Sequence, residues 1–340
     1  MTATPSISTD LQRAARALPK AHLHAHLDGS YPRLAVEALA RRRGRSFHVP
    51  SVFVDVWEFF DFYGTVPELV ESHEDLASLC RALVHAEAAE SVLYLEPAIE
   101  PQLYAPRLGS LEQVADTMLR AFAEASQDAG IQVGALLTIN TDEDLAIAED
   151  LARVAAERAG SGVTALGTAG FVEPGQLGRF KAAASIARAA GLPIASHAGQ
   201  TGGPDSILEA LDELGAARIS HGFRAIESSE LMQRLAADQI VCDICPVSNN
   251  RLGLIEDLED HPAPRLLAAG IPVTLNADDS LWFGATITDQ YEIARSAWSA
   301  DDQTLAAFAR SGALAAGMTT ETRQRFQDGI DAWLMEGVLR

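Results

Sequence analysis

The sequence predicts an α/β fold: a (β/α)₈ TIM barrel with a helical excursion after strand 1 and closing C-terminal helices. Eight short apolar runs rich in β-branched residues recur along the 340 residues, and segments with helical periodicity separate them. Strands that alternate with helices form a parallel sheet, and eight such units favour a closed barrel over an open sheet. The composition, 48% hydrophobic and 21% charged, can supply one large core, so we expect a single domain over residues 1–340.

The expected strands are defined by their apolar runs, which cover residues 21–27, 91–97, 131–139, 163–170, 192–199, 217–223, 239–246 and 271–279. Between them, "DLARVAAERAG" and "RFKAAASIARAAG" have the clearest helical periodicity, and each ends in a Gly suited to a C-terminal cap. The long first connection, residues 28–90, contains the aromatic-rich "FVDVWEFFDFY" and is expected to form a helical excursion over the barrel mouth. Residues 286–340 are expected to form two or three closing helices, and residues 1–8 a flexible tail.

Composition also narrows the class of partner. The net charge of −21 and the pI of about 4.7 argue against binding to a nucleic-acid backbone, which needs a basic surface. The sequence has no signal peptide and no apolar stretch of the roughly 20 residues that a membrane helix needs. Three cysteines are too few for a disulfide framework, and the "CDIC" stretch at 242–245 is interpreted as core packing within a strand. We therefore expect a cytoplasmic protein that binds a small molecule.

Six polar residues follow or end the expected strands: His24, His26, His197, His221, Asp278 and Asp279. The active site of a (β/α)₈ barrel lies at the C-terminal ends of its strands, so these side chains should converge there. The two histidines of the first strand are two residues apart, which places both imidazoles on one face. Zinc takes imidazole nitrogen and carboxylate oxygen, and catalytic zinc sites keep a position for water. We assign one zinc ion per chain to the ligands His24, His26, His197 and Asp278.

The other histidines are not assigned to the metal. His22 shares a strand face with His24, but it enters the strand two residues earlier and should lie nearer the middle of the barrel. The remaining four are in connecting segments and are expected on the surface: His48, His73, His85 and His261.

Five motifs together resemble the adenosine deaminase family of the amidohydrolase superfamily. They are "LPKAHLHAHLDGS" (18–30), "SHAGQTGGPDSI" (196–207), "RISHGF" (218–223), "CPVSNN" (245–250) and "LNADDSLWFG" (275–284). Their order extends the resemblance from residue 18 to about residue 330. The resemblance implies a zinc-activated water that attacks C6 of an adenine ring and releases ammonia. Because HLDG is more typical of the nucleoside enzymes than of adenine deaminases, the implied substrate is adenosine or a modified adenosine.

The resemblance also implies a role for each further site residue. His221 matches the residue that orients and deprotonates the water, and Asp279 matches the group that hydrogen-bonds purine N7. Asp28 matches the carboxylate that meets the ribose 5′-hydroxyl, and Gly170 resembles the glycine whose backbone N–H meets N3. The apolar wall of the nucleoside pocket corresponds to Phe53, Val56 and Phe60.

One position departs from the family where the chemistry is most demanding. The family's HAGE motif supplies a Glu as general acid for the ring nitrogen, a contribution of roughly 10²–10⁴ in rate, whereas this chain has Gln200. An amide can donate a hydrogen bond to N1 but cannot deliver a proton. Gln200, His221 and Asp278 are assigned as the catalytic positions.

Three explanations of Gln200 remain open. In the first, Gln200 is a Glu→Gln replacement that was introduced to trap substrate. In the second, Gln200 is natural, and the protein is a divergent zinc hydrolase of this family whose specialised-metabolism substrate needs no such acid. Alternatively, the protein binds a nucleoside without turning it over. Two further departures favour a substrate other than plain adenosine: Ala98 stands where the family has Arg, and Gly167 stands where it has an acid.

Overall fold

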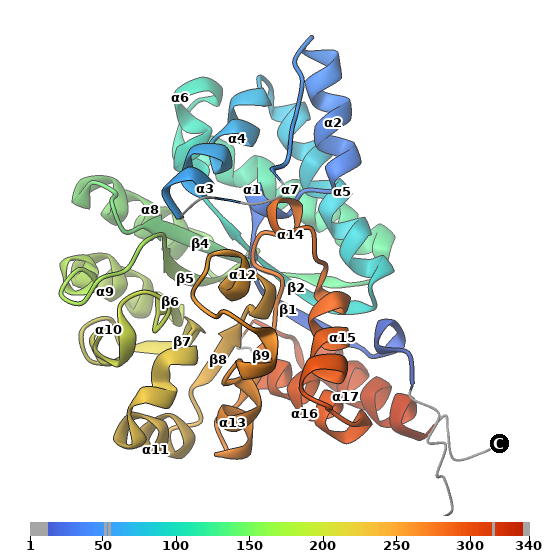
Figure 1. The fold of residues 1–340 in the computed structure, drawn as a ribbon. Helices are drawn as coiled ribbons and strands as arrows, with labels where there is room; N and C mark the ends of the chain where they lie inside the picture. The colour runs from blue at the N-terminus through green and yellow to red at the C-terminus, as the bar shows by residue number, and fades with distance from the viewer. Residues whose placement is uncertain (1–12, 51–52, 54–55, 315–316, 336–340) are drawn as a thin grey trace, which may run out of the picture.

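The computed structural model describes residues 13–50, 53, 56–314 and 317–335, so the expected tail at residues 1–8 lies outside the described part. Eight parallel strands follow one another in chain order around a barrel (Figure 1). They are β1 (Lys20–His26), β2 (Val92–Ile99), β4 (Ala135–Asn140), β5 (Val163–Ala169), β6 (Ile194–Ala198), β7 (Ala216–His221), β8 (Val241–Ile244) and β9 (Val273–Leu275). A two-residue strand, β3 (Gln132–Val133), pairs with β2 beside this path. The predicted (β/α)₈ barrel is confirmed, and each expected strand overlaps an observed one.

The barrel closes through Asp278, just beyond β9. The backbone N–H of Asp278 donates to the carbonyl of His24 at 3.1 Å, and the N–H of His26 donates to the carbonyl of Asp278 at 3.0 Å. These two bonds join the end of the last strand to the end of the first. Barrel closure therefore places the predicted carboxylate ligand directly beside two of the predicted histidine ligands.

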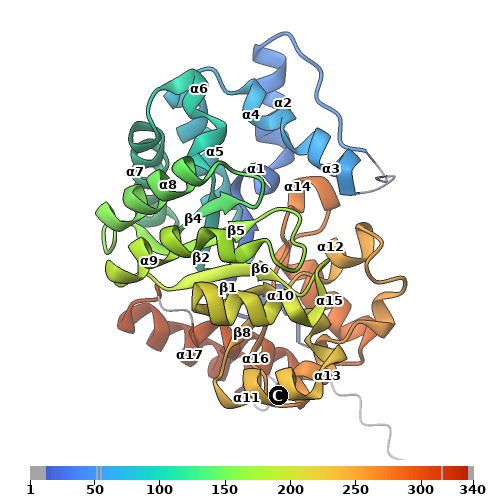
Figure 2. The same ribbon diagram turned by 90° about the vertical axis from the view of Figure 1, so that its left-hand side faces the viewer.

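Helices surround the barrel, as the two perpendicular views in Figures 1 and 2 show. Those between successive strands are α5 (His73–Ala89), α6 (Ala105–Leu108), α7 (Leu111–Ala129), α8 (Leu145–Glu157), α9 (Lys181–Ala189), α10 (Gly203–Glu209), α11 (Ser229–Ala237), α12 (Pro246–Arg251) and α13 (Ala263–Ala268). The α7 helix begins with a capping box at Ser110 and ends before Gly130, which has a left-handed conformation. After α14 (Ser280–Phe283), the predicted closing helices are α15 (Ile287–Ala297), α16 (Asp302–Ser311) and α17 (Thr320–Met335). Short 3₁₀ or π turns occupy Ala15–Ala17, Pro101–Leu103, Leu177–Phe180, Ala210–Leu214, Phe223–Glu227, Leu258–Asp260 and Gly312–Leu314.

The long first connection forms the predicted helical excursion. Before α5 it contains α1 (Leu27–Ser30), α2 (Arg33–Arg42), α3 (Val56–Tyr63) and α4 (Thr65–Leu69). In Figure 2 these helices lie above the strands of the barrel. The aromatic residues of α3 therefore reach the mouth of the barrel, where the site is expected.

A buried ion cluster fills the barrel interior below that mouth. The guanidinium of Arg218, on β7, donates to the carboxylate of Glu96, on β2. The Nε atom of Arg218 lies 2.8 Å from Oδ2 of Asp243, on β8. All three side chains are buried, and two carboxylates surround the single guanidinium. Since an unpaired buried charge is costly, these strands carry charges that match one another across the barrel.

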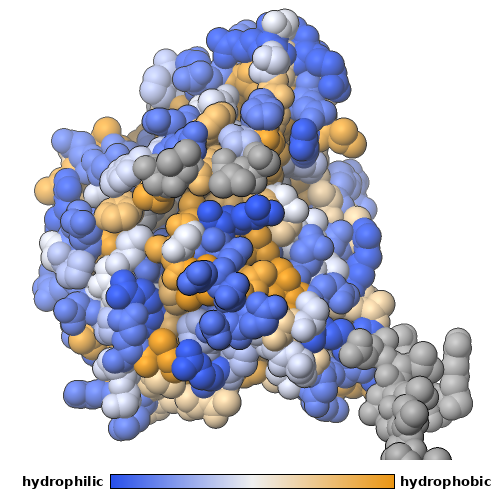
Figure 3. Space-filling view, in the orientation of Figure 1, coloured by the Kyte–Doolittle hydropathy of each residue, from blue (hydrophilic) through white to orange (hydrophobic). Residues whose placement is uncertain are grey.

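Hydrophilic and apolar residues are both visible on the surface (Figure 3). On the face shown in Figure 3, hydrophilic residues in blue predominate, and apolar residues in orange are visible between them near the centre. Within the described residues, no helix is both long and apolar enough to cross a membrane. Cys80, Cys242 and Cys245 are buried and unpaired, as expected for core cysteines.

Candidate active site

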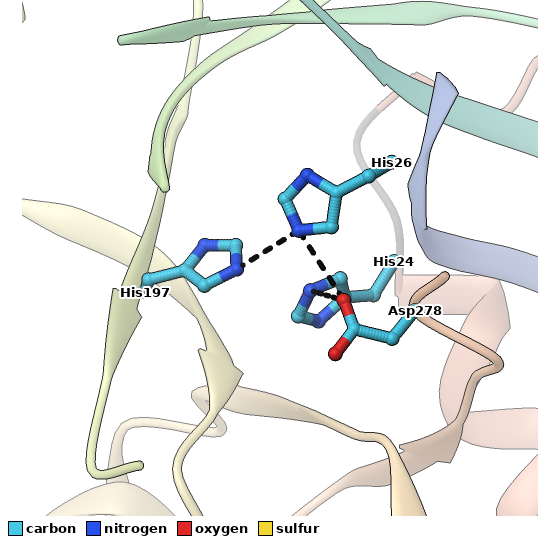
Figure 4. A group of neighbouring side chains, drawn as sticks. All are labelled: His24, His26, His197 and Asp278. Atoms are coloured by element: carbon cyan, nitrogen blue, oxygen red, sulfur yellow. Dashed lines mark hydrogen bonds and ion pairs between the residues drawn. The ribbon is translucent and has the colours of Figure 1, made fainter. Parts of the chain in front are cut away.

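Three histidines and one aspartate converge at the C-terminal end of the barrel (Figure 4). The Nε2 atoms of His24 and His26 lie 3.1 and 3.3 Å from Asp278 Oδ1. The Nε2 atoms of His26 and His197 lie 3.2 Å apart. Ligand atoms about 2.0–2.2 Å from a tetrahedral zinc ion are separated by about 3.3 Å. The predicted ligands therefore have the spacing of groups that share one metal ion.

Backbone carbonyls orient two of these imidazoles. His24 Nδ1 lies 3.3 Å from the carbonyl oxygen of Asp243, and His197 Nδ1 lies 2.5 Å from that of Thr168. Because a carbonyl only accepts, each Nδ1 carries the hydrogen and each Nε2 is left with a lone pair toward the cluster. Within the described residues, the buried Nε2 of His24 makes no hydrogen bond. The donor set thus fits a zinc ion by its chemistry as well as by its spacing.

Two residues at the site have a left-handed backbone that side chains rarely adopt. Asp278 has φ +61° and His221 has φ +70°. The Ser30 hydroxyl donates to the Asp278 carbonyl at 2.9 Å and supports this conformation. Strain of this kind persists where surrounding contacts fix the backbone, and it is concentrated at functional sites.

A cavity of about 320 Å³ opens beside this cluster of histidines and aspartate. Its apolar lining consists of Val56, Phe59, Phe60, Ala169, Phe171, Leu252 and Leu254. Its remaining lining consists of His26, Tyr63, Glu100, Asn140, Gly170, His197, Gln200, Thr201, His221, Asp278 and Asp279. Among the described residues, no Lys or Arg lines this cavity. An apolar cavity with a few polar groups at one end is typical of a small-molecule site.

The structure brings most predicted substrate contacts to this cavity. Gln200, His221, Asp279, Gly170, and the wall residues Val56 and Phe60 all line it. Gly170 has φ +96°, a conformation that other residues rarely adopt, and a Cβ there would lie 2.4 Å from Asn140 Oδ1. Glycine is therefore required at this position of the cavity wall. Gln200 is half-buried and lines the cavity, where its amide can meet a ligand.

Two predicted contacts are not on the cavity wall. Asp28 is fully buried and accepts hydrogen bonds from the hydroxyls of Tyr104 and Tyr63, the latter at 3.5 Å. Burial raises the pKa of Asp28 to about 6. Phe53 packs against the rings of Phe59, Phe62 and Phe283 and forms a layer behind the wall. Asp28 and Phe53 thus contact side chains of the first connection and of later segments, and their contacts with a substrate stay predictions.

Glu100 lines the cavity and was not predicted. It directly follows β2, just as the predicted ligands end or follow their own strands, and this position was the signal available in the sequence. Its side chain is buried, and burial together with the nearby charge of Asp28 raises its pKa to about 8. The Gln102 amide donates to Glu100 Oε2 at 3.3 Å.

The two adjacent aspartates have opposite electrostatic environments. Burial opposes ionisation of Asp278, but His24 and His26 outweigh it and hold its pKa well below the usual range. Burial and the charge of Asp278 raise the pKa of Asp279 well above its usual range. Asp279 Oδ1 is buried and has no hydrogen-bond partner among the described residues. The two neighbouring carboxyl groups therefore differ in their tendency to ionise.

The unassigned histidines divide into two groups. His22 lies outside the cluster, as predicted, because its Nδ1 contacts Glu87 Oε2 at 2.7 Å and its Nε2 accepts from the Ala277 backbone at 3.1 Å. Three others are exposed as expected: His48, His73 and His85. The surface prediction for His261 is wrong, because the ring is buried between Phe223 and Trp298.

Comparisons with known proteins agree with this geometry. The adenosine deaminase family model matches residues 19–333. A putative adenosine/adenine deaminase of Streptomyces coelicolor is 36% identical over 335 residues, which cover 94% of this chain and 97% of the relative. The crystal structure of adenine deaminase from Arthrobacter aurescens has a TM-score of 0.86 at 28% identity, covering 93% of this chain and 99% of that one.

A more distant structure shares the fold and contains zinc. It is an amidohydrolase from Burkholderia ambifaria with bound Zn, 21% identical, with a TM-score of 0.83 and coverage of 96% of this chain and 94% of that one. Because the family model spans nearly the whole chain and the Streptomyces relative is similar over its full length, the protein belongs to the adenosine deaminase family and is a deaminase-like hydrolase.

Proposed function

We propose that the protein is a zinc-dependent hydrolytic deaminase that acts on a purine nucleoside such as adenosine or a modified adenosine. The observation that carries the proposal is the cluster of His24, His26, His197 and Asp278, three of which, His26, His197 and Asp278, line a largely apolar cavity. A flat aromatic ring can enter between the apolar walls and present one edge to the cluster. Deamination needs such an arrangement, because the carbon that bears the amino group must meet a positioned water.

The polar residues that line the cavity have separate roles. When bound, zinc lowers the pKa of its water toward 7 and so supplies the nucleophile. Asp279 donates to a ring nitrogen, and Gly170 offers a backbone N–H at the opposite wall. Gln200 can hold a ring nitrogen by hydrogen bonding but cannot protonate it. The aromatic residues of α3 and Phe171 exclude water from the ring.

Charge favours a ligand without phosphate. The cavity wall carries the carboxyl groups of Glu100, Asp278 and Asp279, and no described Lys or Arg lines it. A phosphate would enter this site without a cationic partner, although arginine and lysine are the usual partners of phosphate. A nucleoside or a free base is therefore preferred to a nucleotide.

Gln200 supports a second candidate within the same family: hydrolysis of a ring that needs no proton from the enzyme. If the ring nitrogen next to the reacting carbon already carries a hydrogen, the Gln200 carbonyl oxygen can accept a hydrogen bond from it. Gly167, which stands on β5 where the family has an acid, is also required by packing within the barrel. A Cβ at this position would lie 2.6 Å from the Ala195 carbonyl oxygen. The test is a substrate panel that includes both adenine-type and lactam-type aminopurines, with ammonia release as the readout.

The position of Glu100 predicts how a sugar is recognised. Replacing Glu100 by Gln is expected to raise KM for nucleosides roughly 10-fold and to leave KM for the free base unchanged. The reason is that a hydrogen bond from a sugar hydroxyl to an ionised carboxylate contributes about 1.5–3 kcal/mol, against about 0.5–1.5 kcal/mol for one to a neutral amide. The assay is therefore run above pH 8, because burial raises the pKa of Glu100 to about 8. Steady-state kinetics on matched nucleoside and base pairs measures the ratio. Asp28→Asn is the matched comparison: if Asp28 is the sugar's partner, that variant changes the ratio and Glu100→Gln does not.

A further inference from the structure

A directed chain of hydrogen bonds reaches His221 from the backbone at the start of α13. The Ala263 N–H donates to His261 Nδ1 at 3.1 Å. A backbone N–H can only donate, so His261 Nδ1 must accept. In a neutral imidazole the single hydrogen then lies on Nε2. Burial, with a smaller effect from Arg265, lowers the pKa of His261 to about 3, in keeping with a neutral ring.

The next link fixes the orientation of a buried amide. His261 Nε2 lies 3.1 Å from Asn249 Oδ1, and it donates because it carries the hydrogen. Asn249 Nδ2 therefore faces the other way and lies 3.3 Å from His221 Nδ1. An amide nitrogen only donates, so His221 Nδ1 accepts. A flipped amide would set its N–H₂ group against the N–H of His261.

Packing holds this chain of hydrogen bonds in place. The side chains of Asn249, His261 and His221 are all buried. The His261 ring lies between Phe223 and Trp298, each with its ring centroid 5.6 Å away. The cavity contains His221 but neither Asn249 nor His261, so both act from behind the wall.

We propose that Asn249 and His261 are positioning residues that hold His221 in its Nε2–H tautomer. His221 Nε2 faces the proposed zinc ligands and lies 3.9 Å from Asp278 Oδ2. The ring thus presents an N–H to the place where the water must sit, and it orients that water by donating a hydrogen bond. The resemblance to the family implies that His221 also deprotonates the water, but a nitrogen that already carries a hydrogen cannot accept one. This assignment rests on the proposed function only for the identity of the group that His221 orients.

Nitrogen NMR tests the tautomer without any substrate. The zinc-loaded protein is labelled with ¹⁵N-histidine, and two-bond ¹H–¹⁵N correlation spectra distinguish Nε2–H from Nδ1–H rings. The His221 signals are assigned by their loss in His221→Gln. The wild type is expected to give the Nε2–H pattern at position 221. Asn249→Asp, whose carboxylate only accepts, is expected to convert it to the Nδ1–H pattern.

A matched control is the neighbouring Asn250, whose amide donates to the carbonyls of Ile255 and Glu256 instead of to His221. Asn250→Asp is expected to leave the His221 tautomer unchanged. A wild-type Nδ1–H pattern, or an unchanged pattern in Asn249→Asp, would overturn the proposal. Since the spectra need no turnover, failure of the tautomer assignment is distinguishable from failure to deaminate.

Position 261 gives a second test if Asn249→Asp does not fold. His261→Gln keeps a side-chain N–H donor for Asn249, whereas His261→Leu removes it. The Gln variant is expected to retain the wild-type His221 pattern, and the Leu variant to give a mixture of tautomers, with one zinc per chain in both. Identical His221 patterns in the two variants would show that His261 has only a packing role.

Discussion

Replacing Gln200 by Glu is expected to raise the deamination rate of adenine-type rings by roughly 10²-fold or more, because a general acid contributes about that much. Gln200 lines the cavity, so a carboxyl group there would face the ring. The gain should appear in kcat, since proton delivery occurs only in the transition state and leaves ground-state affinity alone.

Steady-state kinetics of both forms on adenosine and several 5′-modified adenosines measure this effect, with calorimetric binding to the Gln form alongside. Gln176→Glu is a matched control, because Gln176 lies outside the cavity and its Oε1 accepts from the Glu173 backbone, as a carboxylate could. A Gln200→Glu variant no faster than the parent on any adenine-type ring would favour the second candidate, a substrate that arrives with its ring nitrogen already protonated. Binding without turnover in both forms would favour the non-catalytic alternative.

Replacing Asp278 by Ala is expected to weaken zinc binding by well over the roughly 10–100-fold that loss of an outer hydrogen-bond partner costs. Asp278 contacts both His24 and His26 through one oxygen, so its loss opens the ligand set at its centre. Metal analysis after zinc supplementation gives the stoichiometry, and competition with a chelator gives the affinity.

His22 supplies the matched histidine control for the metal. His22→Gln is expected to retain one zinc per chain and to lower the melting temperature, because both ring nitrogens bond within the barrel. By contrast, His24→Gln should lose the metal, although the two residues are only two positions apart on one strand. Sub-stoichiometric zinc in the supplemented wild type would remove the metal assignment altogether.

The barrel and the convergence of its strand-end histidines and aspartate could be predicted because both depend on local signals. Alternation of apolar runs with helical segments gives the strand order, and parallel strands bring their C-terminal ends together whatever the details of packing. His24 and Asp278 are far apart in sequence, yet barrel closure requires the ends of β1 and β9 to meet.

The sequence could not show what long-range packing decides. Asp28 follows β1 directly, but Tyr63 and Tyr104, from later segments, donate hydrogen bonds to it, and its contact with a sugar stays a prediction. His261 is in a connecting segment with no apolar periodicity, and only the packing of Phe223 and Trp298 buries it. Glu100 satisfied the same strand-end rule as the ligands, and the rule alone did not say which strand ends face the cavity.

Ammonia release from a panel of aminopurine bases and nucleosides is the most direct measurement of metal-dependent deamination by this protein. The wild type and Gln200→Glu are each assayed zinc-loaded, stripped by a chelator, and reloaded with zinc. We expect at least one of the two forms to release ammonia from at least one aminopurine. This activity should disappear when the metal is stripped and return when zinc is added back. Ammonia release that survives complete removal of the metal, or none from any compound by either zinc-loaded form, would contradict the proposed function.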